Sequence, residues 1–378
     1  MALSRIPYKT WIELDASAFR ANANTLRALL GPKTRLWFVV KSNAYGHSLV
    51  HMSTLAQETG VDGFCVDSVI EGGRLREAGI VKPILALGPT LPHLFAPAAE
   101  RDILLTVSGR EYLEALGRSK ARPDFHLKID SGMHRQGFAP EEIPAVAARI
   151  RKHGLARQLK GAYTHFSAAK DPTYQAYTRL QFEKFKAAAA ALKKSGLWGK
   201  GALRHCAASG AAYIDRRYHL DLVRAGIGFY GLWPSRELEL RLDGELSFKP
   251  VLSWRSILSE IKTVEKGAFV GYDMTDRTAR KSRLAVVPIG YWHGFDRGLS
   301  GKGEVLVSGR RARVRGRVSM DMIIIDVTGI PCRVGDTVTL IGRDGGEEIK
   351  AGELAARIDT TAYEVLTRIN PLIKKIVV

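Results

Sequence analysis

Short apolar runs alternate with helical patterns over the first two thirds of the chain. Eight such runs follow one another: LWFVVK, GFCV, PILALG, ILLTV, FHLKID, GAYTHF, LRHCAA and LVRAGIGFYG. The segments between them, such as the alanine-rich YTRLQFEKFKAAAAALKKSG, have the apolar spacing of helices. Strands that each precede a helix build parallel sheets, and no run departs from the alternation. The pattern therefore predicts an α/β fold, an eight-stranded (β/α)8 TIM-like barrel over residues 10–238 that opens with a strand in TWIELD.

The pattern changes after about residue 240. Runs rich in β-branched residues are separated by glycine turns, as in VLSWRSILSEIKTV, RLAVVPIGY, MIIIDVT and DTVTLIG. No helical pattern interrupts them before AGELAARIDTT. This texture predicts a mainly antiparallel C-terminal β domain over residues 239–378. Residues 1–9 are expected to associate with it.

Composition narrows the class of protein. The 378 residues are 46% hydrophobic and 25% charged, as in soluble globular proteins. No window is apolar enough for a membrane span, and the N-terminus has no apolar signal core, so we expect a cytoplasmic protein that does not bind membranes. The cysteines are three in number and far apart, which indicates neither a disulfide framework nor a metal site.

The formal charge of +19 raises the question of a nucleic-acid partner. Its densest run is GRRARVRGR, in which Arg311, Arg313, Arg315 and Arg317 would share one face of a strand. Aromatic residues do not interleave with these arginines, so a solvated sheet face is the favoured interpretation. We expect no nucleic-acid partner.

Polar residues follow the ends of several predicted barrel strands. Lys41 ends the first, Asp130 the fifth and His165 the sixth, while Ser209 follows the seventh and Arg224 lies in the eighth. Strand ends of a parallel barrel meet at one mouth, where barrel enzymes carry their active sites. Burying several charges without mutual partners is costly, so their convergence favours a functional site.

A lysine at such a mouth suggests Schiff-base chemistry, because burial and cationic neighbours free its amine as a nucleophile. The small-residue runs AASGAA and RAGIG supply backbone N–H groups that suit a phosphate. A carbonyl cofactor with a phosphate and a lysine anchor is pyridoxal 5′-phosphate (PLP).

Eight motifs in order then resemble the alanine racemases, PLP enzymes built as a barrel plus a β domain. They are VVKSNAYGHS, LKIDSGMHRQGF, THFS, VRAGIGFYG, VGYDMT, VPIGYWHGFDRG, GRVSMDM and TTAYEV. The resemblance runs from about Trp11 to Ile369.

The resemblance implies that Lys41 holds PLP covalently and acts as the base on the D-enantiomer. It implies that Arg224 faces the pyridine nitrogen and that His165 is hydrogen-bonded to Arg224. A guanidinium cannot accept a proton there, so the ring would stay neutral and be a weaker electron sink. The implied phosphate ligands are Tyr45, Ser209, Tyr363 and the backbone N–H groups of Gly226 and Ile227.

For the substrate, the resemblance implies that Tyr272 is the second base, acting on the L-enantiomer from the opposite face. Arg135 would bind the substrate carboxylate, helped by the backbone N–H of Met320, and Tyr291 would lie at the channel to the site. Lys128 stands where family members often carry a carbamylated lysine. In the family the second base reaches the barrel of the other subunit, so a homodimer with a shared active site is implied.

The resemblance implies that the protein is an amino-acid racemase that interconverts L-alanine and D-alanine and supplies D-alanine for peptidoglycan. This role implies a bacterial source. A broad-specificity racemase acting on lysine, arginine or serine is the first alternative, and a PLP-dependent decarboxylase is disfavoured because those enzymes place an acidic residue at the ring nitrogen. A PLP carrier without turnover would resemble the barrel alone. One departure from the family is Ala208, which stands where an asparagine is usual and removes a polar contact near the cofactor.

Overall fold

The computed structural model of the chain describes residues 7–171, 173 and 175–378. The chain divides into two compact units. The barrel unit comprises Ser17–Ala44 and Leu49–Lys249, and the β unit comprises the described residues up to Ala16, Tyr45–Ser48 and Pro250–Val378. Each unit is treated by itself below. Of the residues 1–9 that are predicted to associate with the β domain, residues 1–6 lie outside the described part.

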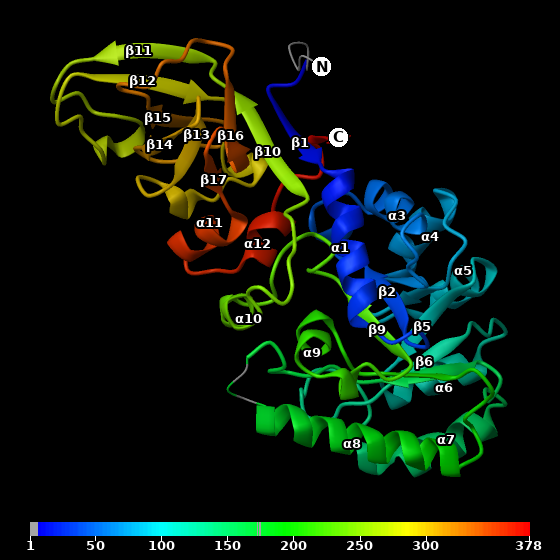
Figure 1. The fold of residues 1–378 in the computed structure, drawn as a ribbon. Helices are drawn as coiled ribbons and strands as arrows, with labels where there is room; N and C mark the ends of the chain where they lie inside the picture. Colours follow the sequence, from blue (N-terminus) through cyan, green and yellow to red (C-terminus); the bar gives the residue numbers. More distant parts are fainter. Residues whose placement is uncertain (1–6, 172, 174) are drawn as a thin grey trace. The chain divides into compact units, whose positions relative to one another are not determined.

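Within the described residues, the barrel unit contains a sheet of eight parallel strands in the order β8-β7-β6-β5-β4-β3-β2-β9 (Figure 1). The strands are β2 (Arg35–Val39), β3 (Gly63–Val66), β4 (Ile84–Ala86), β5 (Ile103–Val107), β6 (Phe125–Lys128), β7 (Leu159–Tyr163), β8 (Leu203–His205) and β9 (Leu222–Ala225). The Arg224 N–H donates to the Ala207 carbonyl at 3.1 Å beside β8, which nearly closes the sheet. This confirms the predicted barrel, and each apolar run of the sequence provides one strand.

Helices follow the strands and lie outside the sheet (Figure 1). They are α1 (Ala16–Leu29), α2 (Lys41–Tyr45), α3 (Leu49–Gln57), α4 (Val69–Glu77), α5 (Phe95–Glu100), α6 (Arg110–Arg118), α7 (Ile143–Lys152), α8 (Gln175–Lys194), α9 (Ser209–Ile214) and α10 (Arg236–Arg241). In α8 the buried positions include Gln181, Phe185 and Leu192, which recur at helical spacing and face the sheet. Charged residues such as Glu183, Lys184 and Lys186 occupy positions between them.

A second sheet forms the β unit. Its order is β11-β12-β15-β14-β13-β16-β10-β1-β18, with β17 paired to β16. Its strands are β1 (Thr10–Leu14), β10 (Leu252–Ile257), β11 (Glu260–Val264), β12 (Ser282–Val287), β13 (Glu304–Val307), β14 (Arg310–Arg315), β15 (Ile323–Asp326), β16 (Thr337–Asp344), β17 (Glu347–Ile349) and β18 (Lys374–Val377). The helices of this unit are α11 (Ala351–Arg357) and α12 (Ala362–Thr367). Strand pairing is antiparallel apart from β1 with β18, which confirms the predicted mainly antiparallel domain.

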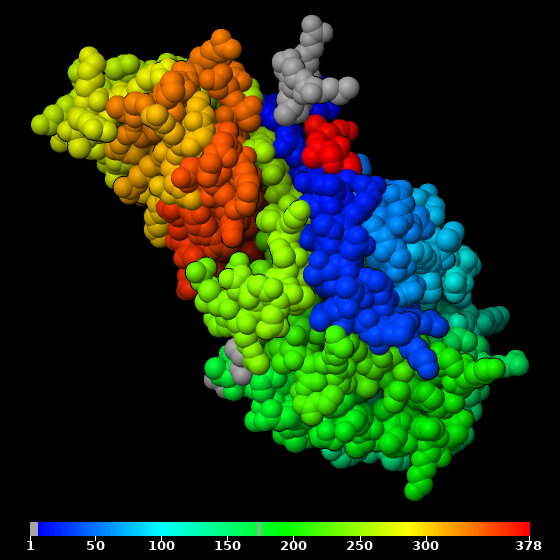
Figure 2. All heavy atoms as spheres, in the orientation of Figure 1, coloured from blue at the N-terminus to red at the C-terminus, as the bar shows by residue number. Residues whose placement is uncertain are grey.

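The first strand of the chain belongs to this second sheet. β1 pairs with β10 on one side and with β18 on the other, and in Figure 2 the red C-terminal residues lie against the blue segment near the N-terminus. The sequence predicts residues from 10 onward with the barrel, so the structure differs at this end. The reason is that both hydrogen-bonding edges of β1 find partners more than 200 residues later, at Leu252–Ile257 and Lys374–Val377, which a local pattern does not reveal.

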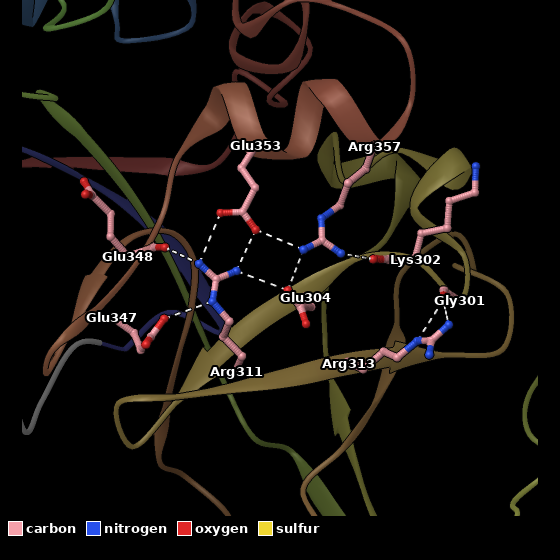
Figure 3. Close-up of polar contacts among 9 residues, drawn as sticks. All are labelled: Gly301, Lys302, Glu304, Arg311, Arg313, Glu347, Glu348, Glu353 and Arg357. Atoms are coloured by element: carbon pink, nitrogen blue, oxygen red, sulfur yellow. Dashed lines mark hydrogen bonds and ion pairs between the residues drawn. The ribbon is translucent and has the colours of Figure 1, made fainter.

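The arginines of β14 are engaged by carboxylates of the same unit. Arg311 forms ion pairs with Glu304, Glu347 and Glu353 at 2.6 to 3.1 Å, and Arg357 joins Glu304 and Glu353 (Figure 3). Further along the row, Arg315 pairs with Asp276 and Asp326, and Arg317 with Asp273. Much of the row's positive charge is therefore balanced within the β unit.

Over the described ranges, the helices are too short or too polar to span a membrane.

Candidate active site

Lys41 begins the segment that follows β2, at the barrel end where strands lead into helices. The next four residues, Ser42–Tyr45, all have left-handed backbone with φ between 53° and 56°. Residues other than glycine pay about 1–2 kcal/mol each for this conformation. The turn is held by the Asn43 N–H, which donates to Glu71 at 3.3 Å, and by the Asn43 side chain, which accepts from the Leu49 N–H at 2.9 Å. Strain of this kind clusters at functional sites, and here it directly follows the lysine.

The loop after β6 is organised by one carboxylate. Asp130 accepts hydrogen bonds from the backbone N–H groups of four successive residues, from Gly132 to Arg135, at 2.8 to 3.1 Å. Burial raises the pKa of the Asp130 carboxyl, but these four bonds outweigh it, so the pKa lies below its ordinary value. The ionised carboxylate thereby fixes the loop that carries Arg135.

Lys128, at the end of β6, is 5% exposed. Burial and the nearby guanidinium groups of Arg224 and Arg135 hold the pKa of its amine well below the ordinary value, against the opposing charge of Asp130. Its Nζ lies 4.4 Å from the centre of the Tyr163 ring. The lowered pKa makes the neutral, nucleophilic form of this amine more accessible than in an exposed lysine.

Arg224, in β9, is 3% exposed and makes well-defined hydrogen bonds. Its Nη1 lies 2.6 Å from His205 Nδ1, and its Nη2 donates to the Thr164 carbonyl at 2.9 Å. The predicted partner His165 is farther away, with Nδ1 3.5 Å from Nη2. The structure thus gives Arg224 a shorter imidazole contact, from His205, than the one that the sequence indicates.

Four basic side chains act on His165. Burial, followed by the charges of Lys128, Arg224, Arg135 and Lys41, holds the pKa of this imidazole well below its ordinary value. The nearby carboxylate, Asp130, is already engaged by four N–H groups. A mouth with this excess of positive charge favours an anionic ligand.

Ser209 begins α9 and is 5% exposed. Its Oγ accepts a hydrogen bond from the Gly226 N–H at 3.1 Å. The hydroxyl hydrogen of Ser209 can therefore be donated elsewhere. The serine, the first turn of α9 and the glycine-rich end of β9 lie together, which suits a phosphate.

The remaining predicted residues lie in the β unit. Tyr45 and Tyr363 are neighbours there, with ring centres 5.8 Å apart. Trp292 donates its N–H to the Met320 carbonyl and Tyr291 donates to Ser319, each at 3.0 Å, so the loops of Tyr291 and Met320 run side by side. Tyr272 is 67% exposed, and the adjacent Asp273 pairs with Arg317 at 2.9 Å.

These residues fit PLP on the structure's own chemistry. A lysine at the barrel mouth can anchor an aldehyde, the cation cluster suits a phosphate and a carboxylate, and a donor-only guanidinium at Arg224 can face an unprotonated ring nitrogen. Across the described part of the chain, no grouping of three histidine, cysteine or carboxylate residues could hold a metal ion.

Comparison with known families decides the relationship. The family described as "Alanine racemase, N-terminal domain" matches residues 14–234, and "Alanine racemase, C-terminal domain" matches residues 251–377. The chain belongs to the alanine racemase family.

Individual relatives agree with this assignment. An alanine racemase of Leptospira interrogans is 37% identical over 98% of this chain and 96% of its own, and one of Halothermothrix orenii is 38% identical over 97% and 96%. The solved alanine racemase of Bacillus anthracis with bound L-Ala-P superposes with a TM-score of 0.91, at 34% identity over 99% of this chain and 96% of that one. The Enterococcus faecalis enzyme gives a TM-score of 0.89 at 32% identity, over 98% of each chain. The family and the barrel-plus-β-domain fold expected from the motifs are confirmed.

Sequence reasoning missed several residues of this alanine racemase family member that contact its predicted site. The Lys128 amine lies over the Tyr163 ring, and the Tyr163 hydroxyl forms a hydrogen bond of 2.9 Å with the Thr106 hydroxyl. His205 and, behind it, His126 extend from Arg224 into the barrel interior. His126, Tyr163 and His205 each stand as a polar residue within an apolar run, in FHLKID, GAYTHF and LRHCAA. A polar residue in a buried strand was the feature of the sequence that could have identified them.

Proposed function

We propose that this member of the alanine racemase family interconverts L-alanine and D-alanine with PLP as cofactor. The observation that carries the proposal is that Lys41, Arg135 and Arg224 all act on the half-buried imidazole of His165. In a chain of this family, these side chains supply an amine to anchor an aldehyde and two guanidinium groups for anionic or acceptor partners.

When bound through Lys41, PLP withdraws electrons from the substrate's α-carbon and makes its α-proton acidic. Ser209 and the Ile227 N–H would hold its phosphate from the barrel unit. The Gly226 N–H, which donates to Ser209 here, would have to leave that bond to join them. Tyr45 and Tyr363 are further proposed phosphate ligands. Arg224 would donate to the ring nitrogen. Because a guanidinium stays protonated, it leaves that nitrogen unprotonated and limits how strongly the ring draws electrons.

Racemisation needs a base on each side of the α-carbon, one that removes the proton and one that returns it. We assign these roles to the Lys41 amine, for the D-enantiomer, and to the Tyr272 hydroxyl of a second copy, for the L-enantiomer. The exposure of Tyr272, 67%, supports this role because the hydroxyl is open to a partner. Met274, Met320 and Met322 are also more than half exposed on the β unit, as expected of a surface covered by a second subunit.

Arg135 would bind the substrate carboxylate in bidentate fashion, with the Met320 N–H as a second contact from the partner and Tyr291 lining the access channel. In its neutral form, the Lys128 amine would react with carbon dioxide, in which the nitrogen bonds to the carbon and loses a proton. The resulting carbamate would carry a negative charge to orient Arg135. D-Alanine from this reaction would serve peptidoglycan synthesis.

The test is chiral analysis of L-alanine, L-lysine and L-serine after incubation with PLP-loaded protein in D₂O. We expect D-alanine with deuterium at the α-carbon, and little product from the other two. A methylene that fits poorly costs only ~1–3 kcal/mol, so efficient turnover of lysine would instead identify a broad-specificity racemase. Absence of α-exchange with all three would refute the proposed function.

A further inference from the structure

A line of three buried side chains runs from Arg224 into the barrel interior. Arg224 Nη1 lies 2.6 Å from His205 Nδ1, and His205 Nε2 lies 2.7 Å from His126 Nδ1. Both imidazoles are fully buried and Arg224 is 3% exposed. The three residues come from β9, β8 and β6, so the line crosses the interior rather than following one strand.

The direction of these hydrogen bonds follows from the arginine. A guanidinium has donors and no acceptor, so His205 Nδ1 must accept and the ring carries its proton on Nε2. That Nε2–H then donates to His126 Nδ1, which places the second proton on His126 Nε2. One arginine therefore fixes both tautomers, and both rings are neutral.

The surroundings keep the rings neutral. Burial, and after it the charges of Arg224 and Lys128 with the neighbouring His126, holds the pKa of His205 well below its ordinary value. Burial and Arg224 lower the pKa of His126 to about 3. The Tyr163 ring stacks on His205 at 4.7 Å and 5°, and its hydroxyl contacts Thr106 rather than either imidazole.

The line ends at His126. Its Nε2 has no hydrogen-bond partner within the described residues, and the Trp37 ring lies against it with centres 6.0 Å apart. A buried N–H without a partner costs free energy. We infer that this cost is offset by the two hydrogen bonds that the His126 ring makes possible, from His205 to His126 and from Arg224 to His205. The benefit falls on Arg224, whose Nη1 is held by His205 while its Nη2 is held by the Thr164 carbonyl.

We propose that His205 and His126 are positioning residues, which hold the Arg224 guanidinium in one orientation through a one-way chain of hydrogen bonds, Arg224 to His205 to His126. A guanidinium has five N–H groups, so this chain leaves Arg224 with further donors for a ligand. This role rests on the proposed function only in naming that ligand as the PLP ring nitrogen. The chain itself is a property of the folded barrel.

The first test is ¹⁵N NMR of the histidine side chains in the PLP-loaded and the cofactor-free protein. We expect His205 and His126 as neutral rings with the proton on Nε2, without titration from about pH 5.5 to 8.5, where exposed histidines titrate. Signals are assigned with His205→Asn and His126→Asn. A proton on Nδ1 of either ring, or protonation of either ring in this range, would overturn the proposal.

The second test compares His126→Leu with His126→Asn. Leucine leaves the His205 Nε2–H without an acceptor, whereas the asparagine oxygen can take the place of Nδ1. We expect His126→Leu to change the visible absorption of bound PLP and to lower kcat/KM about tenfold, and His126→Asn to restore both to within about threefold. The matched control is His219→Leu, which removes another buried imidazole, bonded to the Ala212 carbonyl at 2.9 Å, and should leave the spectrum unchanged.

The outcomes separate the two proposals. Equal behaviour of the leucine and asparagine variants, or a leucine spectrum like that of the control, would refute the positioning role. If His126→Leu does not fold, the NMR result on the unmodified protein still decides. Protein with the expected tautomers but without racemisation of alanine would contradict the proposed function and leave the hydrogen-bond chain standing.

Discussion

Tyr272 and Lys41 are placed differently by the fold, although both are assigned as bases. Lys41 follows a buried strand and is fixed by a strained turn, whereas Tyr272 lies exposed in a short turn of the β unit. A base that must meet a substrate held by another copy has to be accessible, and a lysine that anchors a cofactor has to be fixed. The two roles therefore have separate structural signatures at the residue scale.

Removing the Tyr272 hydroxyl tests its role. We expect Tyr272→Phe to lower kcat for L-alanine about 10²–10⁴-fold, the usual contribution of a general base, while the protein still binds PLP. Deuterium exchange from each enantiomer, followed by NMR, measures it. The matched control is Tyr8→Phe, at a tyrosine that is 38% exposed. Unchanged L-alanine turnover would remove Tyr272 from the mechanism.

Lys128 gives a second prediction at this scale. Incubation with ¹³C-bicarbonate should yield a carbamate signal that is absent from Lys128→Met. The same variant should raise KM for alanine about 10- to 150-fold, because Arg135 loses a charged partner worth ~1.5–3 kcal/mol. Lys160→Met, at a half-exposed lysine paired with Asp124, is the control. A spectrum without a carbamate would leave Lys128 as an unmodified lysine packed on Tyr163.

At the scale of elements, the left-handed turn after Lys41 carries a measurable strain. Ala44 has φ of 53° and Ala56 lies in the right-handed helix α3, yet both methyl groups are fully buried. We expect Ala56→Gly to lower the free energy of unfolding and Ala44→Gly to lower it less or to raise it. The gap should be about 1–2 kcal/mol, the cost of a left-handed L-residue. Urea unfolding followed by circular dichroism measures it, and equal losses would contradict the strain.

The loop before β12 is joined to β14 by Asp276. Its hydrogen bonds to Arg315 come first among the causes that lower its pKa from 3.8 to about 2, although burial opposes them. A carboxyl with a lowered pKa stabilises the fold above its unfolded pKa and loses that contribution as pH falls through the folded value. The stability advantage of the unmodified protein over Asp276→Asn should therefore shrink from about pH 4 to pH 2.

Urea titrations at successive pH values measure this advantage. Asp273→Asn is the matched control, because Asp273 forms an exposed pair with Arg317, and exposed pairs contribute little. A constant difference between Asp276→Asn and the unmodified protein across this window would show that the carboxylate does not act through its charge.

The elements of the barrel could be predicted because most of its strands, such as β3, β5 and β6, are buried on both faces and read as apolar runs. The partners of β1 could not, since pairing of Trp11 with Arg255 and Lys374 leaves no local trace. The left-handed turn was also beyond the pattern, because Ser42 and Ala44 are not residues that favour positive φ.

For the candidate site, the strand ends predicted which residues would meet at the mouth, whereas the contacts in the barrel interior required coordinates. His126 and His205 stand on β6 and β8, which are separated in the sheet by β7. Their contact crosses the barrel, so it depends on strand tilt and side-chain direction rather than on spacing. The exposed Tyr272 was found through resemblance alone, because a Gly-Tyr pair has no distinctive periodicity.

At the scale of the whole molecule, the proposed homodimer predicts complementation. Lys41→Ala and Tyr272→Phe should each be inactive, but a randomly mixed dimer restores one complete site if the base comes from the partner. Mixing equal amounts under exchange conditions should recover about a quarter of the unmodified activity, since half of the dimers are mixed and each has one of two sites intact. Activity near zero after proven subunit exchange would place both bases in one chain.

The pairing of β1 with β10 and β18 also bears on how the protein is made. A ribosome releases Thr10–Leu14 first, yet this strand gains one neighbour only after residue 257 and the other only after residue 377 has emerged. All eight barrel strands, counted over the described residues, lie between these partners in the sequence. During synthesis the barrel can close while β1 still has two open edges. Both edges stay open until β10 has emerged, and one stays open until β18 arrives. Slowing translation between the last barrel strand and β10 should therefore increase aggregation more than slowing it just before β18, when one edge of β1 is already paired.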